Sequence, residues 1–183
     1  MRPIPGLDQL LDRAKALGVF GTKERSVINS ANPTGIAGLV RQQFELAAQV
    51  LRHGLVPILE PEYSINASDR AEGEAILREE ILHGLEALPP AQPVMLKLSL
   101  PVTPNFYRAL VDHPKVLKVV ALSGGYSRDA ACAQLERNHG VIASFSRALL
   151  DGLRVSMSDS EFDSAFAESI DAIDRASTVK TSL

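Results

Sequence analysis

Short apolar runs, each followed by polar or charged residues, recur along this chain of 183 residues. They cover residues 19–22, 55–59, 94–100, 116–122 and 141–146. Continuous Val, Ile and Leu are typical of a parallel strand that helices cover on both faces. Helical apolar patterns separate the runs, and such alternation predicts an α/β protein with a parallel sheet.

One of these runs contains a lysine at a position that is normally apolar. Lys97 lies inside residues 94–100. Burial of an unpaired ammonium is costly, and the usual response is a lowered pKa that leaves the amine neutral. A neutral lysine amine attacks carbonyl carbon, which is the basis of Schiff-base catalysis. The alternative is that Lys97 lies at the strand end and extends into solvent.

Two other runs end in paired charges. Glu60 and Glu62 flank a proline after the second run and are a candidate general acid and base. Lys23 and Arg25 follow the first run two residues apart, so they share a face if the strand continues.

The last two runs end in residues suited to phosphate. Ser123, Gly124 and Gly125 follow the fourth run, and Arg147 follows Ser146 at the end of the fifth. Backbone amides around glycines form anion-binding nests, and a guanidinium matches phosphate oxygens. In (β/α)8 barrels, phosphate is often held by the loops after the last two strands.

Five segments in this order resemble class I fructose-bisphosphate aldolase, most closely its shorter bacterial form. They are GTKERS (residues 21–26), VPILEPE (56–62), MLKL (95–98), ALSGGYS (121–127) and ASFSRAL (143–149). The resemblance covers residues 4–176. It implies a cytoplasmic glycolytic and gluconeogenic lyase that reversibly cleaves fructose 1,6-bisphosphate to dihydroxyacetone phosphate and glyceraldehyde 3-phosphate, with no metal or other cofactor.

The resemblance also implies roles for single residues. Lys97 matches the lysine that forms the Schiff base, Glu60 the glutamate that relays protons, and Glu62 a second acid beside it. Lys23 matches a cation near the nucleophile, which we expect to lower the pKa of Lys97. Arg25 matches a cation near the far phosphate.

The phosphate pocket of the ketone half is the remaining part of this implied site. Ser123, Gly124, Ser146 and Arg147 match it, and Gly125 belongs to the same turn. Many family members have glycine where Ser146 stands, but a serine amide can still donate a hydrogen bond.

Composition excludes several other classes of protein. The net charge of −3 argues against nucleic acid or an anionic membrane as the main partner. The single cysteine, Cys132, excludes an intrachain disulfide and suits a reducing cytosol. The four histidines show no metal-ligand spacing: His53, His83, His113 and His139. We find no signal peptide and no run of 18 apolar residues.

Chain length sets the expected domain organisation. A barrel of this class needs about 250 residues, roughly 31 per βα unit, so this chain has room for about five units. We therefore expect residues 1–183 to form one domain, the C-terminal five-eighths of an aldolase-type TIM barrel. This domain would contain the strands that are numbered 4 to 8 in the barrel of the family, followed by a C-terminal helix. By the family's pattern, an aspartate and a lysine of the active site lie on the first three strands.

A partial barrel leaves sheet edges exposed, which favours association. We therefore expect a homo-oligomer or a complementing N-terminal chain. Two alternative functions stay open. One is a Schiff-base aldolase for another sugar phosphate, distinguished by whether Lys23 and Arg25 are required. The other is a non-catalytic remnant or assembly subunit.

Overall fold

A single parallel sheet organises the protein. The computed structural model describes residues 4–89 and 91–181. Within them, the strands pair in chain order, and every neighbouring pair is parallel. They are β1 (Gly21–Ile28), β2 (Val56–Tyr63), β3 (Val94–Ser99), β4 (Val116–Leu122) and β5 (Val141–Ala143). Sequential parallel order with helical connections is the arrangement of part of a (β/α)8 barrel, so the expected fold class is confirmed.

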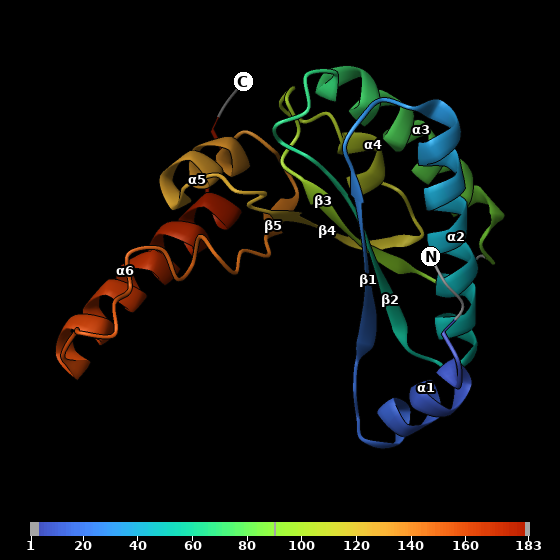
Figure 1. Cartoon of the computed structure of the whole chain (residues 1–183), viewed down its shortest axis with the longest axis horizontal. Coiled ribbons are helices and arrows are strands. Elements are labelled where there is room, and N and C mark those ends of the chain that lie inside the picture. The colour runs from blue at the N-terminus through green and yellow to red at the C-terminus, as the bar shows by residue number, and fades with distance from the viewer. Residues whose placement is uncertain (1–3, 90, 182–183) are drawn as a thin grey trace.

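Helices precede, connect and follow the strands (Figure 1). They are α1 (Leu7–Ala16), α2 (Pro33–Arg52), α3 (Arg70–Ala87), α4 (Arg108–Val111), α5 (Arg128–Glu136) and α6 (Asp159–Thr178). Figure 1 shows α2 and α3 side by side near β1 and β2, with α5 and α6 near β5. In the described part of the chain, no helix is both long and apolar enough to cross a membrane.

The main core lies between the sheet and its helices. Leu59, Leu96 and Val119 are buried there with Val40 of α2 and Leu77 of α3. Side chains alternate between the two faces of a strand, so the residues between these apolar ones point to the opposite face. That opposite face carries Lys23 and Arg25 of β1, Glu60 and Glu62 of β2, and Lys97 of β3.

The strands extend beyond the apolar runs seen in the sequence. The first run ends at residue 22 and the second at residue 59, before the charged pairs. Instead, β1 continues to Ile28 and β2 to Tyr63. Lys23, Arg25, Glu60 and Glu62 therefore lie within strands, because only every second residue of these strands must be apolar.

The apolar stripe of the last helix, formed by Phe162, Phe166, Ile170 and Ile173, is only partly buried. Phe162 and Ile170 are 42% and 44% exposed. Figure 1 shows α6 projecting away from the sheet, and its buried residues, Ser169 and Ala176, lie in its second half. α6 packs mainly against α5 and β5.

Tyr63 anchors the end of β2 to α3. Its side chain is fully buried, and its hydroxyl donates to Asp69 Oδ1 over 3.0 Å. Asp69 Oδ2 accepts from the backbone amide of Ala31 over 2.7 Å, which ties the loop after β1 to the start of α3. Gly73 leaves room for the Tyr63 ring, since an added Cβ would overlap it.

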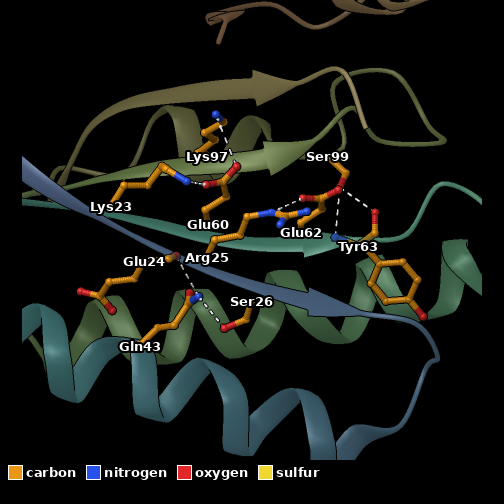
Figure 2. A network of polar contacts seen from close by, with 10 residues as sticks. All are labelled: Lys23, Glu24, Arg25, Ser26, Gln43, Glu60, Glu62, Tyr63, Lys97 and Ser99. Atoms are coloured by element: carbon orange, nitrogen blue, oxygen red, sulfur yellow. Dashed lines mark hydrogen bonds and ion pairs between the residues drawn. The ribbon is translucent and has the colours of Figure 1, made fainter. Parts of the chain in front are cut away.

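The helix-facing side of β1 contains a buried acid. The carboxylate oxygens of Glu24 have no hydrogen-bond partner among the described residues, and burial raises the pKa of Glu24 to about 7. Gln43 of α2 donates its side-chain amide to the backbone carbonyl of Glu24 over 3.1 Å and to Ser26 Oγ over 3.2 Å (Figure 2). Glu24 is thus separated from the charged face of the sheet.

The packing of Gly73 against the Tyr63 ring leads to a prediction about stability. Gly73→Ala is expected to lower the free energy of unfolding by about 1–3 kcal/mol, because the new methyl group displaces a fully buried ring. Gly38→Ala in α2 is the matched control, because nothing lies within 4 Å of its added Cβ. It is expected to raise that free energy by about 0.4–1 kcal/mol. Urea unfolding measures both; equal effects would contradict the assigned packing.

Burial of Glu24 predicts a pH dependence of stability. Its pKa is about 7 in the folded state against an ordinary 4.5, so the folded state holds this proton more tightly than the unfolded state does. Stability is therefore expected to fall as pH rises from about 4.5 to about 7. Glu24→Gln should remove this fall and be more stable than the parent above about pH 7. Exposed Glu168→Gln serves as the control. Superimposable pH profiles for the parent and Glu24→Gln would contradict this assignment.

Candidate active site

A polar cavity of about 450 Å³ lies on the charged face of the sheet. Its lining comes from β1, β2 and β3 and from the ends of β4 and β5: Lys23, Arg25, Glu60, Glu62, Lys97, Leu122, Ser123, Gly124, Ser144, Ser146 and Arg147. The structure thus brings together every site residue predicted from the sequence except Gly125. Gly125 lines an adjacent cavity together with Arg147.

Lys97 is largely enclosed in this cavity. Its side chain is 13% exposed, and its Nζ lies 3.4 Å from Glu60 Oε1. The second oxygen of Glu60, Oε2, accepts a hydrogen bond from Lys23 Nζ. The Glu60 carboxylate, 4% exposed, therefore lies between two ammonium groups, as Figure 2 shows. Lys97 does not extend freely into solvent.

Strand register explains why these side chains meet. In the β1–β2 ladder, Arg25 pairs with Glu60 and Val27 with Glu62. In the β2–β3 ladder, Ile58 pairs with Met95. Residues two apart share a face, so the charged positions of three strands converge on one side of the sheet.

Arg25 and Glu62 form a second ion pair beside the first. Arg25 Nε donates to Glu62 Oε2 over 2.8 Å, and this hydrogen bond raises the pKa of Arg25. The Arg25 side chain is half exposed, whereas Glu62 is largely buried. The guanidinium is therefore held at the open side of the cavity.

The turn after β4 presents backbone groups to the cavity. The Tyr126 amide donates to the Ser123 carbonyl over 2.9 Å and closes this turn. Gly124 and Gly125 have φ of 63° and 113°, which side-chain-bearing residues rarely adopt. Successive amides in such a turn form an anion nest.

The charge of the cavity differs from that of the whole protein. Four cations and two carboxylates line it, while the chain carries a net charge of −3. Local excess of positive charge suits a ligand with phosphate groups. Within residues 4–89 and 91–181, no cluster of three His, Cys, Asp or Glu side chains could hold a metal ion.

Sequence reasoning missed two residues of this region. Ser144 lines the cavity. Ser144 lies two residues before Ser146, the same spacing that separates Glu60 from Glu62. This spacing of two was the sequence signal that could have placed Ser144 in the site. Ser99 Oγ accepts from the Tyr63 amide over 3.0 Å and donates to the Tyr63 carbonyl over 2.7 Å, so it fastens β3 to β2 (Figure 2). No local signal distinguishes Ser99 from other serines.

Comparisons with known proteins identify homologues. No protein-family model matches the chain. It is 55% identical over 177 residues to the class 1 fructose-bisphosphate aldolase of Synechocystis sp. and 50% identical over 177 residues to that of Porphyromonas gingivalis. Each alignment covers 97% of this chain, but 59% and 60% of the respective relative.

A solved structure supports the fold. It is the fructose-bisphosphate aldolase of Plasmodium falciparum in complex with TRAP and a small-molecule inhibitor, with a TM-score of 0.72 and 20% identity. The match covers 97% of this chain and 63% of that one. The chain is thus a homologue of class 1 fructose-bisphosphate aldolase and spans about three fifths of the length of the relatives it matches.

Proposed function

We propose that this chain carries the Schiff-base centre of a class 1 fructose-bisphosphate aldolase, a carbon–carbon lyase. The reaction is the reversible cleavage of fructose 1,6-bisphosphate to dihydroxyacetone phosphate and glyceraldehyde 3-phosphate. One observation carries the proposal: the Lys97 amine lies 3.4 Å from the Glu60 carboxylate in a cavity that Arg147 also lines. We assign Lys97 as the nucleophile, Glu60 as the acid–base group and Arg147 as a phosphate-binding cation; all three line the same cavity.

The first step is formation of the imine. Transfer of a proton from the Lys97 ammonium to the Glu60 carboxylate, 3.4 Å away, gives a neutral amine and a protonated acid. The neutral amine then attacks C2 of the ketose and gives a carbinolamine. Protonated Glu60 donates a proton to the C2 hydroxyl, which leaves as water, and an iminium forms on Lys97. Glu60 is left as a carboxylate between Lys23 and the iminium nitrogen.

The second step is cleavage of the C3–C4 bond. Electrons of that bond move toward the iminium nitrogen and produce an enamine, while C4 becomes an aldehyde. The C4 hydroxyl proton passes to the Glu60 carboxylate, and glyceraldehyde 3-phosphate leaves. Protonation of the enamine at C3 and addition of water then release dihydroxyacetone phosphate and the free Lys97 amine.

Two groups of residues would hold the phosphates. Amides and side chains of Ser123, Gly124, Gly125, Ser146 and Arg147 surround the phosphate of the ketone half. Lys23 and Arg25 attract the phosphate of the aldehyde half, and Glu62 holds the Arg25 guanidinium in place through their 2.8 Å contact. The proposed partner is therefore a sugar bisphosphate, and the proposed location is the cytoplasm.

Lys97→Arg tests this proposal. The variant keeps the positive charge but has no amine that forms a stable imine, so it should abolish exchange of a C3 hydrogen of dihydroxyacetone phosphate with solvent deuterium. Proton NMR measures this half-reaction, which needs only the ketone half of the site. Lys118→Arg, at an exposed position of β4, is the matched control and should exchange at the parental rate. Equal exchange by the Lys97→Arg variant would exclude Schiff-base chemistry at this site.

We propose further that the outer edge of β1 is covered by a second copy of the chain or by another chain that supplies further strands. Among the described strands, β1 pairs only with β2. Val27 on β1 and Val19 and Phe20 before it are exposed. An unpaired strand edge beside exposed apolar side chains favours association.

Light scattering tests this association. The purified chain is expected to show a mass above the 19.7 kDa of one copy. Val27→Lys places a charge on the exposed edge and should shift the chain toward the monomer. A parental monomer that binds no hydrophobic dye would contradict the proposal.

A further inference from the structure

A buried arginine outside the proposed catalytic set connects the loops that surround the site. Arg70 is the first residue of α3 and is 6% exposed, and its partner Glu74 is 2% exposed. Neither side chain lines the cavity around Lys97. Replacement of a buried ion pair by apolar residues is often neutral for stability, so stability alone does not account for this pair.

The guanidinium of Arg70 is hydrogen-bonded in three directions. Its Nε donates to Glu74 Oε1 over 2.7 Å, its Nη1 to the Tyr126 hydroxyl over 2.8 Å, and its Nη2 to the Leu100 carbonyl. Glu74 Oε2 accepts from the Val102 amide over 3.0 Å. The ion pair therefore holds the segment after β3 and the segment after β4 against the start of α3.

Both held segments adjoin proposed site residues. Leu100 lies three residues after Lys97 on the same chain segment. Tyr126 directly follows Gly125, and its amide donates to the Ser123 carbonyl. Tyr126 thus closes the Ser123–Gly124–Gly125 turn through its backbone and connects that turn to Arg70 through its side chain.

We propose that Arg70 is a positioning residue, which acts through Tyr126 to hold the turn after β4 in the conformation that binds phosphate. This inference rests on the proposed function. The two glycines of the turn have wide conformational freedom, so backbone amides pointing at one anion require an external anchor. The hydroxyl of Tyr126 provides that anchor, since a planar guanidinium fixes the direction of its hydrogen bonds.

The test compares two tyrosine variants in the full chain. Tyr126→Phe removes the hydroxyl and keeps the ring. Tyr107→Phe is the matched control, because its buried hydroxyl has no hydrogen-bond partner in the described part of the chain. Hydrogen exchange of the peptide spanning the turn is measured without ligand, and the affinity for inorganic phosphate is measured by titration.

Tyr126→Phe is expected to speed hydrogen exchange in the turn and to weaken phosphate binding about three- to tenfold. The reason is that the variant loses one hydrogen bond to a charged group, which water replaces only in part. Tyr107→Phe should leave both unchanged. Unchanged exchange in Tyr126→Phe would overturn the proposal whatever the phosphate result. A parental chain that binds no phosphate contradicts the proposed function instead, and the exchange comparison still decides whether Tyr126 holds the turn.

A double variant separates positioning from folding. Arg70→Met alone would leave the Glu74 charge buried without its partner, so it is combined with Glu74→Leu. The double variant is expected to unfold cooperatively near the parental denaturant midpoint, yet to show the fast turn exchange and weak phosphate binding of Tyr126→Phe. A folded double variant with parental phosphate affinity would overturn the proposal.

Discussion

The proposed site depends on the contacts of the Glu60 carboxylate with two lysines. Two ammonium groups, those of Lys23 and Lys97, contact its two oxygens on the charged face of the sheet. Without a shared anion, the two like charges would repel each other. Glu60 therefore permits a lysine nucleophile and a second cation to occupy one cavity, and it places an acid–base group beside the amine that needs one.

The parallel register of the strands and the alternation of side chains between the two faces of the sheet produce both the core and the site. On one face of the sheet, residues such as Leu59 and Leu96 pack against α2 and α3. On the other face, the residues between them, such as Glu60 and Lys97, line the cavity. A shift of one residue in β2 would bury Glu60 among the helices and expose Leu59 to the cavity. The hydrophobic core thus fixes the arrangement of the charged groups, and Ser99 reinforces it where β2 and β3 end.

The sequence predicted the fold class and the residues that gather in the cavity, because a lysine inside an apolar run and polar pairs after other runs are local signals. Strand ends were less predictable. Residue 59 was taken as the last of its strand because the apolar run stops there, but β2 needs apolar side chains on one face only and continues to Tyr63. Contacts between distant segments had no local signal in the sequence. The hydrogen bond from Arg70 to the Tyr126 hydroxyl and the one from the Ala31 amide to Asp69 form only when the fold brings these segments together. The half-exposed stripe of α6 likewise reflects which neighbours cover it.

The chain spans about three fifths of its class 1 aldolase relatives, yet it contains the lysine, the acid and the phosphate-binding groups of the proposed site. The most direct test of this account is borohydride reduction of the folded chain in the presence of dihydroxyacetone phosphate, followed by peptide mass mapping. The account predicts one reduced adduct, on the peptide that contains Lys97. A folded chain with no adduct, or with adducts spread over exposed lysines, would contradict the claim that these residues form a Schiff-base centre.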